Sequence, residues 1–203
     1  MIYGVILAGG QSSRFGGQDK GFIQFRQKTM IESVIDVLRP QVDDLLISAN
    51  ANLDAYQQFG HPVIQDNTPG FYGPLMGIYS VMEFIHSNHP SHSPHQHINL
   101  LIVPCDMPLL PHNLKEQLLK TQNHPQQATI VREGNRLQPL VMLLPLSHSS
   151  NLKRYLECGN AKVTDWVLSI NPAVSDFSPQ TGCFDNINSA RELAETEKHH
   201  ANN

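Results

Sequence analysis

A glycine-rich segment near the start of the chain combines the residue types that bind phosphate. Residues 7–20 read LAGGQSSRFGGQDK and directly follow a short apolar stretch. Gly9 and Gly10 lack a Cβ, so the backbone there can adopt positive φ and bring its amides close to phosphate oxygens. Arg14 offers a planar fork of donors, and Lys20 offers a mobile point charge. This combination is suited to bind the polyphosphate of a nucleoside triphosphate.

An aspartate follows a second apolar stretch. Residues 104–111 read PCDMPLLP, which places Asp106 shortly after the buried strand expected at 99–103. A lone aspartate at a strand end is most often a turn former or a helix cap, and the local sequence leaves that alternative open. Beside a phosphate-binding loop, however, a carboxylate is suited to Mg²⁺, which prefers one or two carboxylates together with substrate phosphates and water. The neighbouring Cys105 has no predicted base, so we interpret it as a buried structural thiol.

The glycine-rich segment differs from two familiar nucleotide-binding motifs. A Walker A loop has Ser or Thr after its lysine, whereas Lys20 is followed by Gly21, and the dinucleotide fingerprint GxGxxG is absent. The segment instead resembles the LAGGxSxRxGGxDK signature of nucleotidyltransferases, and specifically of the molybdenum cofactor guanylyltransferase family. The sequence around Asp106 resembles the PCDxPxxP metal-binding element of the same family. A tight strand-to-helix connection with incidental surface charges is the structural alternative.

Further matches extend the resemblance from residue 2 to residue 193. Asn50 and Asp66 each follow a predicted strand and match the family's nucleotide-contacting Asn and Asp. Residues 73–78 read GPLMGI and resemble the family's GPLxG loop. Asn186 and Asn188 resemble its NxN element, which is associated with the molybdopterin side of the cleft. As turn and cap residues, the two asparagines would also have a purely structural explanation.

The resemblance implies an activity and a set of site residues. The terminal phosphate of Mo-molybdopterin attacks the α-phosphorus of GTP, and pyrophosphate leaves. The implied catalytic residues are Arg14, Lys20 and Asp106, with Asp106 as the Mg²⁺ ligand. The implied nucleotide-binding residues are Leu7, Ala8, Gly9, Gly10, Lys20, Asn50, Asp66 and Asp106. The implied molybdopterin-binding residues are Gln138, Asn186 and Asn188, of which Gln138 is matched only loosely.

Other functions stay open. A cytidylyltransferase for the same cofactor, or a nucleotidyltransferase for a sugar or alditol phosphate, would share the fold and a related loop. The Gly9-Gly10 doublet favours the guanylyl branch, because cytidylyl relatives typically read LAAG there. A noncatalytic nucleotide-binding regulator would not need the metal ligand Asp106, and a structural α/β subunit would bind no ligand. The resemblance also leaves open contacts with other cofactor-biosynthesis proteins and with apo-molybdoenzymes.

Composition limits the partners and the location. The chain has 203 residues and a formal net charge of -4, with its Lys and Arg scattered, so no nucleic-acid partner is expected. No apolar run reaches the length of a membrane span, and residues 2–7 are too short for a signal-peptide core. We therefore expect a cytoplasmic protein without a membrane partner. Its three cysteines are widely spaced and odd in number, as expected for reduced thiols.

Strand and helix patterns alternate along the chain. The expected strands are 2–7, 44–49, 62–65, 99–103 and 128–132, with a further apolar run at 140–144. One expected helix begins after Thr29, which forms a possible capping box with Glu32, and continues until Pro40. Further helices are expected at 75–85, 151–157 and 161–169. This alternation predicts a three-layer α/β fold of the Rossmann-like nucleotidyltransferase type, with a mostly parallel sheet and helices on both faces.

The predicted organisation is one domain, residues 1–198, followed by a polar tail, residues 199–203. Residues 87–97 are rich in His, Ser and Pro and form a predicted loop insertion. Its four histidines could bind metal, but prolines disfavour a regular element that would fix their geometry. We interpret the segment as a solvated loop and assign it no function.

Overall fold

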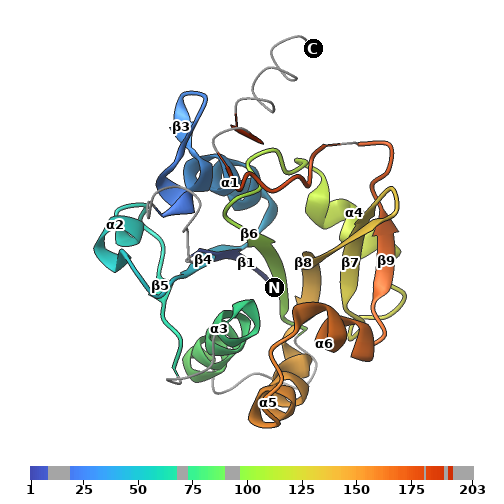
Figure 1. The fold of residues 1–203 in the computed structure, drawn as a ribbon. Coiled ribbons are helices and arrows are strands. Elements are labelled where there is room, and N and C mark those ends of the chain that lie inside the picture. The colour runs from blue at the N-terminus through green and yellow to red at the C-terminus, as the bar shows by residue number, and fades with distance from the viewer. Residues whose placement is uncertain (9–18, 68–72, 90–96, 181, 190–191, 194–203) are drawn as a thin grey trace.

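A mixed sheet forms the centre of the computed structural model, which describes residues 1–8, 19–67, 73–89, 97–180, 182–189 and 192–193 (Figure 1). Its strands are β1 (Ile2–Leu7), β4 (Asp44–Ser48), β5 (Val63–Ile64), β6 (Asn99–Pro104), β7 (Thr129–Glu133), β8 (Arg136–Pro145) and β9 (Ala173–Asp176). They are ordered β5-β4-β1-β6-β8-β7-β9. Only β8 runs antiparallel to its neighbours, so the prediction of a mostly parallel sheet is confirmed.

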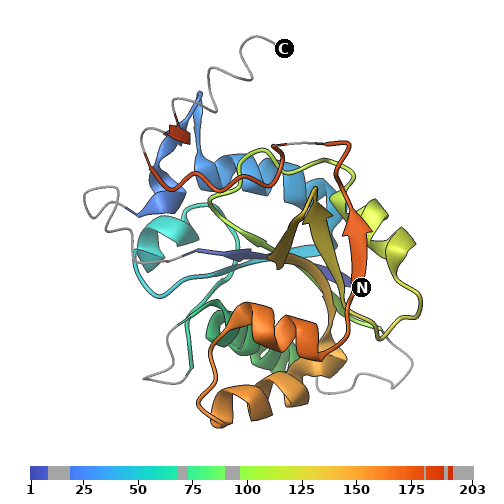
Figure 2. The same ribbon diagram turned by 45° about the vertical axis from the view of Figure 1, so that its right-hand side comes forward.

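Helices cover both faces of this sheet (Figure 2). On one face lie α1 (Met30–Leu38), α2 (Leu53–Gln57) and α4 (Leu114–Thr121). On the other face lie α3 (Pro74–Asn88), α5 (Ser149–Glu157) and α6 (Val163–Ser169). The predicted three-layer architecture is therefore confirmed. Among the described residues, no helix combines the length and apolar character that crossing a bilayer requires.

The central strands β1 and β6 are mostly apolar because both of their faces are buried. In β1, Val5 packs with the α3 side of the core and Ile6 with the α1 side, and both are fully buried. In β6, Ile102 and Val103 divide between the two sides in the same way. Such strands have no polar face, which explains why their sequences read as continuous hydrophobic runs.

The start of α1 follows from its capping residues. The Thr29 side chain accepts a hydrogen bond from the Glu32 amide, and the Glu32 carboxylate accepts one from the Thr29 amide at 2.7 Å. This pair is the predicted capping box, and it satisfies backbone donors that a helix start leaves free. Hydrogen bonds from Thr29 lower the pKa of Glu32, so the carboxylate that caps the helix is favoured.

The predicted loop 87–97 begins later than expected. Ser87 and Asn88 belong to the last turn of α3, and His89 is its C-cap with φ -130° and ψ 57°. Proline disfavours helical backbone at its own position inside a helix and at the residue before it, and the first proline of this segment is Pro90. The helix can therefore continue through Asn88. His92 and His95 lie outside the described residues.

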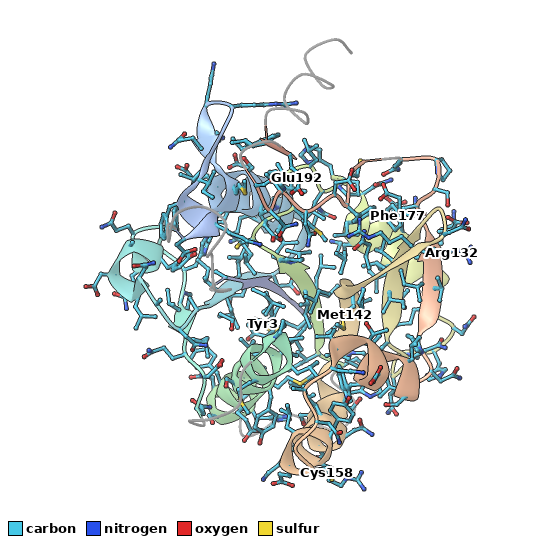
Figure 3. The ribbon with its side chains drawn as sticks, in the orientation of Figure 1. Tyr3, Arg132, Met142, Cys158, Phe177 and Glu192 are labelled. Atoms are coloured by element: carbon cyan, nitrogen blue, oxygen red, sulfur yellow. The ribbon has the colours of Figure 1, made fainter. Side chains whose placement is uncertain are left out.

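A short hairpin and the C-terminal segment meet at one end of the molecule (Figures 1 and 2). The hairpin consists of β2 (Gln24–Phe25) and β3 (Lys28–Thr29). Ile23 and Phe25 on the hairpin side pack with Met30 of α1 and with Ile187 of the C-terminal segment. Figure 3 labels Glu192 further along this segment, on the same side of the molecule as α1. The end of the described chain thus lies beside residues that follow its first strand.

Candidate active site

The carboxyl ends of three strands meet at the candidate site. The Ala8 amide donates to the Ser48 carbonyl at the end of β4, at 2.8 Å. The Cys105 amide donates to the Leu7 carbonyl at the end of β1, at 3.0 Å. In open α/β sheets, ligands bind beyond the carboxyl ends of the strands. Leu7 and Ala8, two of the predicted nucleotide-binding residues, therefore lie at the edge where a ligand is expected.

Lys20 is the cation at the centre of this edge. Its Nζ lies 3.1 Å from Asp106 Oδ2 and donates to Asn188 Oδ1 at 2.5 Å. The side chains of Lys20 and Asp106 are 20% and 11% exposed, so solvent screens this ion pair only in part. Three residues predicted for the site, from three distant parts of the chain, are thus in direct contact.

Asp106 has the properties expected of a metal ligand. Its Oδ2 is bound to Lys20, whereas its buried Oδ1 has no hydrogen-bond partner within the described part of the chain. Buried carboxylate oxygens are costly to leave unpaired, so this atom is suited to a cation. Within the described residues, no group of three or more His, Cys, Asp or Glu side chains could hold a metal alone. The arrangement fits Mg²⁺, which binds through one carboxylate and completes its shell with phosphates and water.

Asn50 and Asp66 form a second polar pair at the same edge. Asn50 Nδ2 donates to Asp66 Oδ2 at 2.8 Å, and the Asp66 amide donates to Asn50 Oδ1 at 2.9 Å. The other carboxylate oxygen, Asp66 Oδ1, is buried without a hydrogen-bond partner in the described structure. Burial raises the pKa of Asp66, and the hydrogen bond from Asn50 opposes this effect. The pair therefore presents one free acceptor among the described residues, Asp66 Oδ1, which is suited to a ligand that donates N–H groups.

A close helix contact positions Asp66. Gly77 in α3 approaches the end of β4 so closely that a Cβ there would lie 2.5 Å from Ser48 Oγ and 3.7 Å from Asp66 Oδ1. A side chain at position 77 would force the Ser48 hydroxyl to move, so glycine is favoured at this contact. The glycine of the GPLMG segment thus allows the N-terminal part of α3 to pack against the strands that carry Asn50 and Asp66.

The C-terminal segment brings Asn188 to the site through backbone contacts. The Ile187 amide donates to the Asp106 carbonyl at 3.0 Å. Gln138 in β8 is buried, and its Nε2 donates to the Phe184 carbonyl at 3.1 Å, which ties the same segment to the sheet. Asn186 Oδ1 is buried without a partner among the described residues. These contacts show how Asn186 and Asn188 are placed, while substrate contact by Gln138, Asn186 and Asn188 stays a prediction.

Part of the predicted phosphate-binding loop is not covered. Gly9, Gly10 and Arg14 lie outside the described residues. Their roles in nucleotide binding and catalysis therefore stay predictions, as does the approach of Arg14 to Lys20.

The three cysteines are free thiols, as expected. Cys105 is buried, and burial raises the pKa of its thiol, which keeps it protonated and unreactive. The interpretation of Cys105 as a buried thiol is confirmed. Cys158 is exposed at the end of α5, on the side of the molecule away from Glu192 (Figure 3).

The sequence interpretation gave no role to Asp19. Its carboxylate accepts hydrogen bonds from the Gly21 amide at 3.1 Å, from the Tyr56 hydroxyl at 2.7 Å and from Asn52 Nδ2 at 3.0 Å. One feature of the sequence could have drawn attention to Asp19: it directly precedes Lys20 in the segment that resembles the nucleotidyltransferase signature. Its partners in α2 could not be identified, because that helix is short and was not predicted.

The fold and the site together are those of a nucleotidyltransferase. Solved structures share the fold: molybdopterin-guanine dinucleotide biosynthesis protein A from Archaeoglobus fulgidus superimposes with a TM-score of 0.76 at 19% identity, over 99% of this chain and 100% of that one. A 4-diphosphocytidyl-2C-methyl-D-erythritol synthase superimposes with a TM-score of 0.69 at 12% identity, over 97% of this chain and 96% of that one. Residues 4–169 match the family model of the MobA-like NTP transferase domain, and the chain belongs to this family.

Curated relatives are similar over nearly the whole chain. The molybdenum cofactor guanylyltransferase of Shewanella sediminis is 38% identical over 192 residues, which cover 94% of this chain and 93% of the relative. The protein of the same name from Shewanella piezotolerans is 37% identical over 94% of this chain and 89% of the relative. The family resemblance seen in the sequence motifs is therefore confirmed.

Proposed function

We propose that this protein transfers GMP from GTP to the terminal phosphate of Mo-molybdopterin, forming molybdopterin guanine dinucleotide and pyrophosphate. The observation that carries the proposal is the contact of Lys20 with Asp106 and Asn188 at the carboxyl edge of the sheet. Relatives named molybdenum cofactor guanylyltransferase, 37–38% identical over 94% of the chain, support the choice of substrates.

The main physical problem of this reaction is charge. Two highly anionic substrates must be held together while charge develops on the transferring and leaving oxygens. Lys20 supplies a cation at the point where β1 and β6 end, and it is partly shielded from solvent. No residue has to act as a general base, because the attacking phosphate already carries a negative charge.

We assign the two substrates to the two sides of Lys20. Asn50 and Asp66 hold the nucleotide, since Asp66 Oδ1 is an acceptor without a hydrogen-bond partner among the described residues. Asn186 and Asn188 hold molybdopterin on the side of the C-terminal segment. Lys20, which contacts Asn188, is assigned to the phosphates of both substrates.

Asp106 is the proposed ligand of Mg²⁺, through the oxygen that Lys20 does not occupy. When bound, Mg²⁺ stabilises negative charge on the phosphate oxygens. Two backbone hydrogen bonds hold Asp106 in place. The Asp106 carbonyl accepts one from the Ile187 amide, and the amide of the neighbouring Cys105 donates one to the Leu7 carbonyl of β1. Arg14, from the glycine-rich segment, is proposed to neutralise further phosphate charge.

A product assay tests the proposed function. The purified protein is incubated with Mg²⁺, Mo-molybdopterin and each of ATP, CTP, GTP and UTP in turn, and dinucleotide and pyrophosphate are quantified. We expect both products with GTP. A dinucleotide formed with CTP instead would favour the cytidylyl alternative. Nucleotide binding without pyrophosphate release from any triphosphate would overturn the assignment as a transferase.

A variant pair tests the role of Asp106. Asp106→Ala removes the proposed metal ligand without opening a cavity in either apolar core, so we expect turnover to be lost while the protein stays folded. Asp176→Asn is the matched control, because Asp176 is a half-exposed carboxylate on the edge strand β9. Near-normal turnover of Asp106→Ala with Mg²⁺ would contradict the assigned role.

A further inference from the structure

Asp19 joins two structural elements next to Lys20. It is the N-cap of the 3-10 helix Lys20–Phe22, and its side chain accepts a hydrogen bond from the Gly21 amide. Its carbonyl also accepts the Phe22 amide at 3.1 Å. The same carboxylate accepts hydrogen bonds from Nδ2 of Asn52, the N-cap of α2, and from the hydroxyl of Tyr56 within α2. A charged acceptor with three donors is a strong local constraint.

The donors to Asp19 are themselves held firmly. Tyr56 is fully buried, and burial raises the pKa of its hydroxyl, which therefore remains a proton donor. Asn52 has φ 53°, in the left-handed region that asparagine tolerates better than most residues. Asn52 is the N-cap of α2 and Tyr56 lies within it, and this helix packs on the core that contains residues of β1 and β4.

Close packing reinforces the hydrogen bonds. Phe22 lies against Tyr56, with ring centroids 4.7 Å apart, and against Phe59, with centroids 6.2 Å apart. A Cβ at Gly21 would lie 2.5 Å from the Tyr56 hydroxyl, so glycine at this position lets Tyr56 reach Asp19. The segment 19–22 is thus fixed on α2 by polar contacts on one side and aromatic contacts on the other.

We propose that Asp19 is a positioning residue for Lys20, which it orients toward Asp106 and Asn188 by anchoring the first turn of the helix 20–22 to α2. The catalytic part of this inference rests on the proposed function of Lys20. The geometric part does not, because it concerns only where the Lys20 side chain lies.

Chemical labelling tests the geometric part. The free protein is acylated with acetic anhydride, and the modification rates of Lys20 and Lys28 are compared by mass spectrometry. Lys28 is the internal reference, since its side chain is 57% exposed on the hairpin and its ion-pair partner, Asp36, is unchanged in both variants. In the wild type, Lys20 should react slowly because two side chains bind its Nζ. In Asp19→Ala, its rate relative to Lys28 should rise severalfold.

A double-mutant cycle tests the catalytic part. Asp19→Ala should reduce kcat/KM for GMP transfer by about ten- to hundredfold, since small displacements of a positioned group cost that much. In a Lys20→Ala background, the same substitution should have little further effect. Tyr56→Phe, which removes one donor and leaves the ring in place, should show a smaller loss with the same dependence on Lys20.

The outcomes separate the two proposals. An unchanged labelling ratio in both Asp19→Ala and Tyr56→Phe overturns the positioning role, whether or not the protein transfers GMP. An equal loss of kcat/KM in the wild-type and Lys20→Ala backgrounds also overturns it. Should the wild type transfer no nucleotide, the proposed function fails, and the labelling ratio still decides the role of Asp19. If Asp19→Ala does not fold, Tyr56→Phe supplies both measurements.

Discussion

The close contact between Gly77 and Ser48 predicts how Gly77→Ala changes the free energy of unfolding. The sign of that change should depend on whether residue 48 is serine or alanine. A Cβ at position 77 would lie 2.5 Å from Ser48 Oγ, well inside van der Waals contact. Overpacking of this kind costs about 1–3 kcal/mol. Alanine inside a helix is more stable than glycine by about 0.5–1 kcal/mol, which offsets part of that cost. We expect Gly77→Ala to lower the free energy of unfolding by about 1 kcal/mol, the difference of these two effects.

Removing the Ser48 hydroxyl should reverse the effect. Without Oγ, the nearest atoms to the new methyl group are Ser48 Cβ at 3.6 Å and Asp66 Oδ1 at 3.7 Å, which are ordinary contacts. In a Ser48→Ala background, Gly77→Ala should therefore raise the free energy of unfolding by about 0.5–1 kcal/mol through helix propensity alone.

Urea denaturation of the wild type, the two single variants and the double variant measures both effects. The coupling energy between the two substitutions should be about 1–3 kcal/mol, the size of the relieved overlap. If Gly77→Ala changes the free energy of unfolding equally in both backgrounds, the steric explanation of this glycine is refuted. Equal denaturant slopes in all four proteins are the control for an unaltered two-state transition.

Three further predictions follow from the site and the first helix. Lys20→Ala should weaken GMP transfer by about 2–4 kcal/mol in kcat/KM, the usual effect of losing one preorganised electrostatic group, and unchanged efficiency would exclude that role. Thr29→Ala should lower the free energy of unfolding by about 1 kcal/mol in urea denaturation, because the cap of α1 is lost, whereas Thr29→Ser should retain most of the stability. Because the pKa of Asp66 is raised in the folded protein, folding favours the protonated carboxyl group. Asp66 therefore lowers the free energy of unfolding as pH rises above the pKa of the unfolded chain, which is near 3.8. The stability of Asp66→Asn relative to the wild type should therefore increase with pH from that value until the pH exceeds the raised pKa of the folded state, and should then level off in unfolding titrations. A difference that is constant over the whole range would contradict the assigned pKa shift.

The sequence was most informative where burial or capping leaves a local pattern. The strands on both sides of β1 could be predicted because burial on two faces requires continuous apolar residues. The start of α1 could be predicted from Thr29 and Glu32, which stabilise it locally. The meeting of Lys20 with Asp106 was anticipated because both follow strands that end at the same edge.

Other elements depend on contacts that no local pattern contains. The helix α2 has five residues, and its stability comes from buried Tyr56 and from the bonds to Asp19. The strand β9 has four residues at the sheet edge, too few to establish an alternation. In α4 only Leu114 and Leu118 are buried, so its apolar stripe is narrow.

One missed feature did leave a signal. β7 ends at Glu133 and β8 begins at Arg136, so only Gly134 and Asn135 connect these antiparallel strands. Gly134 has φ 57°, and a two-residue Gly-Asn connection is typical of a tight hairpin. The dipeptide would have identified the two apolar runs as neighbours and the second as antiparallel.

The arrangement of the C-terminal segment also has a consequence for synthesis of the chain. Every strand of the large sheet has been translated once residue 176 has been added, yet Asn188 comes twelve positions later and is the last described partner of Lys20. A chain of 176 residues would therefore contain every strand of this sheet, but it would lack both the Asn188 contact of Lys20 and the Ile187 amide that donates to the Asp106 carbonyl. Such a chain would also lack Phe184 and Ile187, which are buried in two apolar clusters, so a product that ends before this segment would lose core packing together with the contacts around Lys20.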